Sequence, residues 1–333
     1  MNRQGFQKFV AFAALFSFVP ACKQEPSGGP PNGNDTGLVA AAVPVAIVDR
    51  LKRTVQSSPS AERIVSLSPA TTELLFALGL GDQVVGATKH CNHPARAVDI
   101  PRVGGGLLES ISVETIVSLK PDLVLCKWDT HQPLLDNLER LNIRVCAVGA
   151  QNLDELYEET HWVGQLANRS AEATDLISKM RSRHSELLSL VDDVRTEPPL
   201  SVFYEVWDDP LMTAAPNSFI GELLSMAALE NIVSDTSVRY PRISAETVID
   251  GDPDLILAPT THFENVEIES FRSRPGWSAI SAVANERIHL ISGDEVSRCG
   301  PRLLEALAEI ILVAYPESAG RIGSESSERQ VAP

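Results

Sequence analysis

The chain has 333 residues, enough for two domains with separate cores, and its 44% hydrophobic and 22% charged residues are ordinary for a soluble globular protein. Its formal net charge of −16 argues against nucleic acid as a partner, because phosphate binding needs a basic surface. The same charge permits docking onto a positively charged protein surface.

The first 22 residues are typical of an export signal. Arg3 and Lys8 precede an apolar run, residues 9–19, that is too short to span a bilayer as an ordinary helix. Residues 19–22, Val-Pro-Ala-Cys, then resemble a bacterial lipobox, which predicts lipid on Cys22 and an anchor on a bacterial membrane, facing the periplasm. Simple cleavage before a free Cys22 is the alternative, and inner or outer membrane stays open.

Residues 23–60 are expected to form a tether and a short hairpin. Residues 23–38 are rich in Pro, Gly and polar side chains and cannot bury a core, so they indicate a flexible spacer. Residues 43–55 are expected to form a short hairpin that packs on the first lobe.

Strands and helices alternate through residues 61–167, which predicts a parallel sheet covered on both faces. Strands are expected at 63–67, 84–87, 123–126 and 143–148, and helices at 68–78, 132–141 and 153–167. Residues 170–194 contain no Gly or Pro and repeat apolar side chains at helical spacing. This pattern predicts, within a linking segment 168–196, one helix of roughly 35 Å that acts as a stiff strut between two lobes.

Residues 197–316 are expected to form a second α/β lobe. Strands are predicted at 200–206, 254–257 and 287–291, and helices at 217–228 and 300–315. Residues 317–333 are polar, and we expect them to be disordered.

A fifteen-residue unit occurs once in each predicted lobe. Residues 111–125 and 243–257 are identical at eight positions. In each copy a serine, Ser112 or Ser244, is expected to cap a short helix, and a glutamate, Glu114 or Glu246, lies in its first turn, where a carboxylate suits the helix dipole. A proline then ends the helix, and a buried strand begins. The repeat predicts two similar lobes, each with an exposed glutamate in an equivalent place.

Several motifs together resemble the Fe/B12 periplasmic-binding family, the substrate-binding proteins of ABC importers for cobalamin, haem and ferric siderophores. They are residues 63–73, the two Glu-x-x-x-x-x-x-Pro-Asp-Leu units, Arg274-Pro275-Gly276-Trp277 and residues 300–305. The resemblance covers residues 62–316 and is closest to the vitamin B12-binding branch. It implies the class III periplasmic binding protein fold, in which two Rossmann-like lobes with central, mostly parallel sheets are joined by one long helix.

The resemblance also implies a function. A monomer without enzymatic activity or catalytic cofactor would capture its ligand between the lobes. Glu114 and Glu246 would then dock onto arginines of the ABC permease. The ligand expected is cobalamin, with cobinamide, haem and ferric siderophores left open.

Ligands of α/β sheets lie beyond the carboxyl ends of the strands, and a corrin or porphyrin needs flat aromatic walls and a few polar groups. The ligand-facing candidates on these grounds, and on the family's pattern, are His90, Cys91, Trp128, Trp207, Met212, Tyr240, Asp294 and Arg298. A tryptophan can equally belong to the core, and Asp294 with Arg298 can be a local ion pair.

His90, Cys91 and His93 are residue types that ligate metals, and His90 or His93 could be an axial ligand of the cobalt or iron in a bound ligand. The alternatives are a lining role without coordination and a structural or disulfide role. Completing a metal site would need His131 or Cys299 nearby. Cys126 and Cys146 are expected to be buried as small hydrophobic side chains, although pairing stays open.

Three other functions compete with transport. An enzyme is disfavoured because the chain has no Gly-x-Ser-x-Gly, no phosphate-cradling Gly-x-x-x-x-Gly-Lys and no His-Glu-x-x-His. A binding protein for bare zinc or manganese would need several His and carboxylate side chains to converge. A surface lipoprotein that binds a partner protein and no small molecule is the third.

Overall fold

The computed structural model describes residues 46–57, 60–105, 108–261 and 267–326. No helix within those ranges is both long and apolar enough to cross a membrane. The expected signal segment, Cys22 and the tether lie outside the described residues.

The first lobe is built on a four-stranded sheet in which every pairing is parallel, with the order β4-β3-β5-β6. Its strands are β3 (Ile64–Ser66), β4 (Val84–Ala87), β5 (Leu123–Lys127) and β6 (Val145–Val148). Its helices are α1 (Pro69–Ala77), α2 (Val113–Ser118), α3 (Gln132–Arg140) and α4 (Leu153–Leu166), with 3-10 turns η1 (Gly81–Gln83), η2 (Ala95–Asp99) and η3 (Leu108–Ser110).

The strands of this sheet are apolar along their whole length because both faces are covered. Leu123 and Leu125 of β5 face a core formed with α1 and α4, whereas Val124 and Cys126 face a second core formed with α2 and α3. Alternating strand side chains therefore supply two cores, as expected for a parallel sheet between two helical layers.

The second lobe has a five-stranded sheet with the path β11-β10-β7-β8, in which β9 also pairs with β7. All pairings are parallel except that of β7 with β8, which is antiparallel. The strands are β7 (Ser201–Asp208), β8 (Leu211–Thr213), β9 (Glu230–Asn231), β10 (Leu255–Pro259) and β11 (Ile288–Ile291). The helices are α6 (Phe219–Met226), α7 (Ala245–Gly251), α8 (Ile268–Arg272), α9 (Ser281–Ala284), α10 (Gly293–Val296) and α11 (Leu303–Ala314), with a 3-10 turn η4 (Trp277–Ala279).

One core of the second lobe extends into the first. Leu255 and Leu257 pack with α6 and α11, and the same cluster contains Leu153, Leu156 and Tyr157 from the start of α4. On the other face of the sheet, a separate cluster is formed with α7, α8 and α9. The start of α4 is thus buried in the core of the second lobe while its end belongs to the first.

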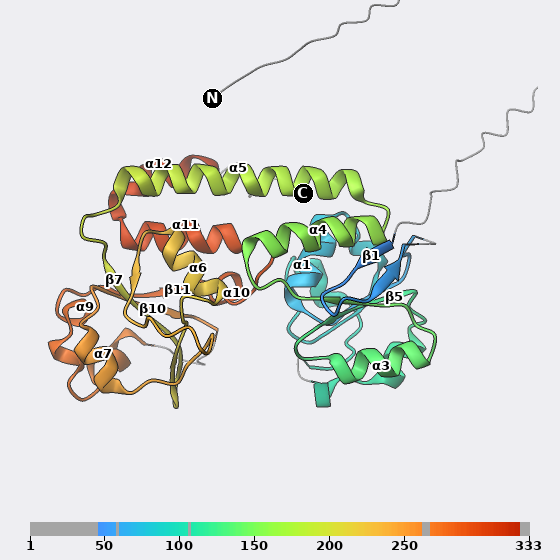
Figure 1. The fold of residues 1–333 in the computed structure, drawn as a ribbon, viewed down its shortest axis with the longest axis horizontal. Coiled ribbons are helices and arrows are strands. Elements are labelled where there is room, and N and C mark those ends of the chain that lie inside the picture. The colour runs from blue at the N-terminus through green and yellow to red at the C-terminus, as the bar shows by residue number, and fades with distance from the viewer. Residues whose placement is uncertain (1–45, 58–59, 106–107, 262–266, 327–333) are drawn as a thin grey trace, which may run out of the picture. The chain divides into compact units, whose positions relative to one another are not determined.

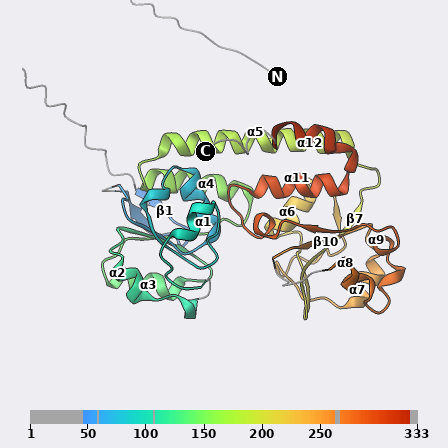
Figure 2. The same ribbon diagram turned by 180° about the vertical axis from the view of Figure 1, so that it is seen from behind.

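The long helix α5 (Ser170–Val194) has the bounds that the sequence predicts and packs on α4 and on α11 (Figures 1 and 2). Its buried side chains, Ala173, Met180, Leu187, Leu190 and Val191, recur at helical spacing. A single continuous helix against both lobes resists bending more than a pair of flexible strands would.

The chain end differs from the expectation of disorder from residue 317 onward. A 3-10 turn η5 (Pro316–Ser318) leads into α12 (Ala319–Ser326), which lies beside α5. Ile322 is buried, and Arg321 forms an ion pair of 2.6 Å with Asp193 of α5. In the part of this helix whose side chains are described, the apolar anchor is Ile322 and the ion pair is that of Arg321, a signal too sparse to stand out in a polar segment. Residues 327–333 lie outside the described part.

A hairpin precedes the first lobe, formed by β1 (Ala46–Val48) and β2 (Thr54–Gln56). Asp49 in its turn is buried, accepts a hydrogen bond from Ala147 N of β6, and pairs with Arg53 at 2.6 Å. Arg50 N also donates to Ala147 O. The turn therefore covers part of the outer edge of β6, since both backbone polar groups of Ala147 are engaged there, and this limits pairing of that edge with another chain.

Candidate functional site

Two aromatic side chains follow strands of the first and second lobes. Trp128, after β5, is half-buried, and its Nε1 donates to Gly149 O at 3.0 Å. Trp207, at the end of β7, is 38% exposed, and its Nε1 donates to Asp209 O at 2.8 Å. Trp207 therefore offers more open aromatic surface to a ligand than Trp128 does.

Met212 and Tyr240 lie near Trp207 in the second lobe. Met212 stands opposite Trp207 in the β7–β8 pairing. Tyr240 packs against the shared core, and burial, with smaller contributions from Cys299 and Asp129, raises the pKa of its hydroxyl above the usual range. The phenol is therefore neutral and able to donate a hydrogen bond.

The carboxyl-end loops of the two lobes meet at this place. Arg239 Nη1 donates to Gln151 Oε1 at 2.8 Å, and Cys299 Sγ lies 3.6 Å from Asn152 O. Leu153 N donates to Glu222 Oε2 at 3.2 Å. These contacts join the segment after β6 to α6 and to the loops of the second lobe.

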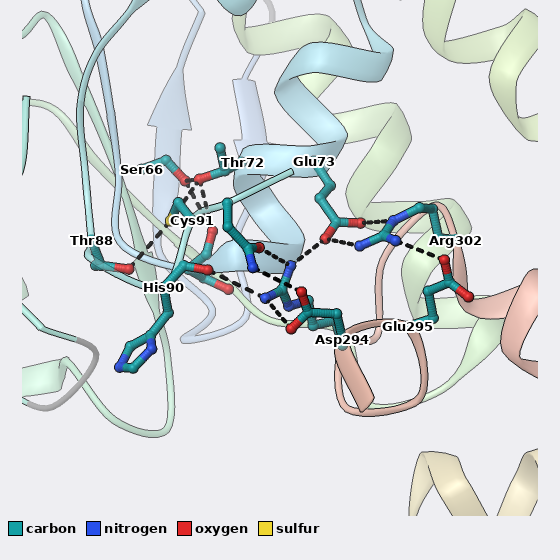
Figure 3. Close-up of polar contacts among 12 residues, drawn as sticks. Ser66, Thr72, Glu73, Thr88, His90, Cys91, Asp294, Glu295 and Arg302 are labelled. Carbon is teal, nitrogen blue, oxygen red and sulfur yellow. Dashed lines mark hydrogen bonds and ion pairs between the residues drawn. The ribbon is translucent and has the colours of Figure 1, made fainter. Parts of the chain in front are cut away.

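A polar cluster joins the lobes at a second place (Figure 3). We call it the interlobe cluster, and its members are Glu73, Asn92, Asp294, Glu295, Arg298 and Arg302. The side chain of Glu73 is only 3% exposed, and its carboxylate accepts from Arg298 Nη1 at 2.8 Å and from Arg302 Nε and Nη2 at 2.9 and 2.8 Å. Arg302 Nη1 also binds Glu295 Oε1 at 2.7 Å.

Arg298 and Asp294, both of the second lobe, form the local ion pair of the alternative interpretation, and Arg298 also binds residues of the first lobe. Arg298 Nη2 lies 2.6 Å from Asp294 Oδ1 and also donates to His90 O, while Nη1 donates to Asn92 Oδ1. Both terminal nitrogens of this guanidinium are therefore engaged by the protein itself. Its assignment as a direct ligand contact stays a prediction, which this geometry disfavours.

Cys91 does not fit the expectation of a ligand-facing side chain. It is fully buried, and its Sγ lies 3.1 Å from Thr72 Oγ1 and 3.2 Å from Thr88 Oγ1 (Figure 3). Arg102 Nη1 also donates to the carbonyls of Thr88 and Cys91. Because a small thiol fits this buried site, we correct its assignment to a residue that fixes the 88–94 loop from inside.

His90 and His93 point to different places. The His90 ring is exposed and directed away from the interlobe cluster in Figure 3. His93 lines a groove of about 300 Å³ together with Phe76, Pro94 and Pro301, and burial, followed by the charge of Arg302, lowers its pKa. The His90 ring thus lies in the open, whereas His93 lies in a groove beside Glu73 and Arg302, and a ligand contact of either histidine stays a prediction.

The remaining donors that were considered for a metal site are dispersed. His131 is buried at the start of α3, where its Nδ1 accepts from Lys127 N, and Cys299 is buried beside Asn152. Within the residues that the structure describes, no group of three or more His, Cys, Asp and Glu side chains could hold a metal ion. The four cysteines in those ranges, Cys91, Cys126, Cys146 and Cys299, are buried and unpaired.

Glu159 is a fully buried carboxyl group beneath the loop after β6. Its Oε2 accepts from Gly149 N at 2.6 Å, and burial raises its pKa to about 7, against the opposing effects of that hydrogen bond and of Arg50. The group can therefore gain or lose a proton near neutral pH at the place where the lobes meet.

The two repeated helices carry the expected glutamates at their starts. Ser112 Oγ accepts from Thr115 N, and Ser244 Oγ accepts from Thr247 N, as the repeat predicts for capping serines. Glu114 and Glu246 are exposed in the first turns of α2 and α7. Hydrogen bonds from its own backbone N–H and from Ser244 lower the pKa of Glu246, which keeps that carboxylate charged.

The interlobe cluster is not predicted by the sequence motifs, although two of its residues lie within them. Glu73 ends the segment 63–73 and Arg302 lies in the segment 300–305, two of the motifs on which the family resemblance rested. Each motif was interpreted within its own lobe, and nothing in a linear pattern shows that the two side chains meet.

Comparison with known proteins agrees with this architecture. The profile of a family described as periplasmic binding protein matches residues 64–294. The chain belongs to the periplasmic binding protein family. The predicted resemblance and the class III fold are thereby confirmed, and members of this family are transport components rather than enzymes.

Among the relatives of this periplasmic binding protein is an uncharacterized ABC transporter substrate-binding lipoprotein of Bacillus subtilis, YvrC. It is 31% identical over 280 residues, which are 83% of this chain and 87% of the relative. A vitamin B12-binding protein of Vibrio cholerae is 28% identical over 75% of this chain and 88% of its own. A solved structure described as a possible iron-binding periplasmic solute-binding protein, from Staphylococcus epidermidis, is 28% identical with a TM-score of 0.67, covering 77% of this chain and 99% of its own.

Proposed function

We propose that this periplasmic binding protein is the substrate-binding lipoprotein of an ABC importer and that it captures a corrinoid, cobalamin, between its lobes for delivery to a membrane permease. Support for the transport role comes from the family and from the substrate-binding lipoprotein of Bacillus subtilis. Support for the ligand comes from the vitamin B12-binding relative of Vibrio cholerae. Lipid on Cys22 and permease contacts through Glu114 and Glu246 are part of the proposal.

The observation that favours a corrinoid over haem is the engagement of Arg298. Its guanidinium is bound by the carboxylates of Glu73 and Asp294 within the protein. The propionates of haem need a cation, and carboxylate recognition by arginine is strongest when the guanidinium is unshared. The side chains around a corrin ring end mostly in neutral amides, which need hydrogen-bonding groups instead, such as His90 and the phenol of Tyr240.

Haem and ferric siderophores are the specific alternatives. Lys89 and Arg242 are exposed cations on the carboxyl-end loops, and either could meet an anionic ligand. The solved structure described as possibly iron-binding keeps this alternative in view. A partner-binding surface lipoprotein without a small-molecule ligand is the alternative of another class.

The shared core supports a mechanism with little hinge motion. The start of α4 is buried in the core of the second lobe, and α5 packs on both α4 and α11. Moving the lobes apart would expose part of this apolar surface to water, at roughly 25 cal/mol per Å². Small-angle scattering is expected to give nearly the same radius of gyration with and without ligand; a large ligand-dependent change would contradict rigid capture.

Calorimetric titration of the purified protein with cyanocobalamin tests the ligand directly. Haemin and a ferric siderophore serve as parallel titrants. One-to-one binding of cyanocobalamin alone is the expected result. Binding of haemin or the iron chelate alone would keep the transport role and change the ligand, and silence with all three would favour the partner-binding lipoprotein.

A further inference from the structure

The side chains of the interlobe cluster are bound to one another and largely buried, so the cluster can hold the two lobes together. Glu73 of the first lobe has both oxygens engaged by two arginines of the second, and the three side chains Glu73, Arg298 and Arg302 are 3%, 11% and 22% exposed. Ion pairs shielded from water in this way are weakened by salt far less than exposed pairs. Separating the lobes here would leave the carboxylate of Glu73 without either of its partners, and Arg298 and Arg302 with one carboxylate each, Asp294 and Glu295.

The backbones also approach closely at this place. A Cβ atom added to Gly300 would lie 3.3 Å from Ala70 Cα, in the first turn of α1. A larger residue at position 300 would push the second lobe away from α1. Glu73 lies one turn further along α1. The arginines that bind it, Arg298 and Arg302, therefore flank a backbone segment that already contacts this helix.

The cluster also determines where the 88–94 loop lies. Arg298 holds the loop from the second lobe through His90 O and Asn92 Oδ1, and Asn92 Nδ2 donates to Asp294 Oδ2 at 2.8 Å. Arg102 holds the other side of the loop from the first lobe, through the carbonyls of Thr88 and Cys91. The exposed ring of His90 is thus supported by charged groups of both lobes.

We propose that Glu73 is a positioning residue that sets the spacing of the two lobes and the orientation of His90 and Asn92 without touching the ligand. Glu73 orients Arg298, and Arg298 in turn orients the loop. The role in affinity rests on the proposed function, whereas the role in lobe spacing does not. A ligand that contacts both lobes then binds a site whose width is already fixed, which reduces the entropic cost of binding.

Glu73→Gln is the decisive variant because it keeps the shape of the side chain and removes its charge. Arg298 and Arg302 each retain one carboxylate partner, Asp294 and Glu295, so the chain is expected to fold. Glu205→Gln is the matched control. Glu205 is likewise a buried carboxylate bound by an arginine, Arg274, but both partners belong to the second lobe.

Lobe spacing can be measured without any ligand. Spin labels on Ser118→Cys and Asp250→Cys, exposed at equivalent places in α2 and α7, report the distance between the lobes. Full-length protein with Cys22→Ser is used so that position 22 takes no label; Cys91, Cys126, Cys146 and Cys299 are buried. Glu73→Gln is expected to give a broader distance distribution with a longer mean, and Glu205→Gln the native distribution. An unchanged distribution in Glu73→Gln would overturn the proposal.

Affinity is measured in parallel with cyanocobalamin, haemin and a ferric siderophore. For whichever titrant the native protein binds, Glu73→Gln is expected to raise the Kd at least about tenfold, and Glu73→Asp, which keeps the charge, to raise it less. An unchanged Kd in Glu73→Gln would overturn the role in affinity. If the native protein binds none of the three, the proposed function fails, while the distance measurement still decides the role of Glu73 in spacing the lobes.

Discussion

The two lobes share the same local structure where the strands after the repeated helices begin. Asp122, before β5, accepts hydrogen bonds from the backbone N–H groups of Glu62 and Arg63, and Asp254, before β10, accepts from Ser201 N and Oγ. Lys120 and Asp252, each followed by a proline, have φ values of 49° and 36°. Helix, left-handed residue, proline and strand therefore recur as one folding unit, with a glutamate exposed at the start of each copy.

Where the strands end, the lobes share one hydrogen bond, from a backbone N–H to a glutamate of the following helix, but the burial of that glutamate differs. Gly149 N, after β6, donates to Glu159 of α4, and Ser292 N, after β11, donates to Glu309 of α11. Glu159 is fully buried because the start of α4 lies in the core of the second lobe, whereas Glu309 is only half-buried. The second lobe also inserts β8 and exposes Trp207 beside it.

The starts of the strands are alike in the two lobes and the ends differ, which is consistent with a docking role on one side and a ligand-binding role on the other. In the proposed function, both lobes dock onto the permease through the side on which the repeat lies, which would require both copies to keep the same geometry. The proposed ligand would touch the opposite side, at the carboxyl ends of the strands, where the two lobes contribute unlike surfaces to one asymmetric molecule. Variants in matched pairs, one in each lobe, can test this separation.

The largest effects are expected from the buried ion pair of each lobe. Asp49→Asn removes the buried carboxylate that binds Arg53, which keeps its exposed partner Glu139, and Glu205→Gln removes the carboxylate that binds Arg274 in the second lobe. Glu205→Gln is expected to lower the free energy of unfolding by about 3–5 kcal/mol, because it leaves Arg274 without its carboxylate partner, and Asp49→Asn by less, because Arg53 keeps Glu139. Urea unfolding measures the change in the free energy of unfolding. Asp175→Asn, in the exposed pair with Lys179, is the control and should cost at most about 0.5 kcal/mol. A loss no larger than the control in either lobe would contradict the prediction.

A pH-dependent difference between the lobes comes next. The folded-state pKa of Glu159, about 7, lies above its unfolded value, so its contribution to stability is present at low pH and is lost as pH rises through 7. Glu159→Gln removes this titration, and its stability relative to the native protein is expected to rise by about 3 kcal/mol between pH 4.5 and pH 8. Unfolding series at both pH values measure the change.

Glu309→Gln supplies the matched control for Glu159. Burial also raises the pKa of Glu309, but this carboxyl group is only half-buried. Its pH-dependent gain is therefore expected to have the same sign and a smaller size. Equal gains in the two variants would show that the shared core does not distinguish the lobes at this position.

The sequence predicted the fold well because its determinants are local. The repeat at 111–125 and 243–257 specifies a cap, a stop and a buried strand within fifteen residues, and α5 has the bounds that its uninterrupted apolar spacing predicts. Alternation of strand and helix was enough to predict parallel sheets. Each of these signals is complete within one short segment of the chain.

The candidate site was predicted less well because its determinants are distant in sequence. Cys91 was assigned to the ligand from its residue type, but the thiol is enclosed by Thr72 and Thr88. The interlobe cluster joins Glu73 to Arg302 over more than two hundred positions. Loop positions after strands can be predicted from sequence, whereas the direction of a side chain in such a loop depends on partners that only the fold brings near.

Trp207 of the second lobe and Trp128 of the first are expected to differ in how they affect ligand affinity and stability. Trp207→Ala is expected to weaken cyanocobalamin binding by about 1–2 kcal/mol, the usual range for an aromatic contact, and to leave stability nearly unchanged because this ring is 38% exposed. Trp128→Ala is expected to reduce stability as well, since this ring packs in the core of the first lobe and binds Gly149 O. Calorimetry and thermal unfolding separate the two effects. Unaltered affinity in both variants would remove the aromatic walls from the proposal.

The smallest effects are expected from the two glutamates that are proposed to dock onto the permease, each tested alone. Exposed ion pairs contribute at most about 1 kcal/mol each, so Glu114→Gln or Glu246→Gln is expected to weaken association with the permease no more than about fivefold. The two losses should be nearly equal, since α2 and α7 present their glutamates in the same capped geometry. Ligand affinity should not change, because these helices lie at the starts of the following strands.

The double variant is the sharper form of this last test. If both lobes dock at once, the two losses add in free energy and multiply in affinity, and cellular uptake falls further than in either single variant. Glu172→Gln, an exposed glutamate in the first turn of α5, is the control and should leave uptake unchanged. A double variant that is no worse than one of the singles would mean that a single lobe carries the docking, and the repeat would then reflect a shared folding unit rather than a shared function.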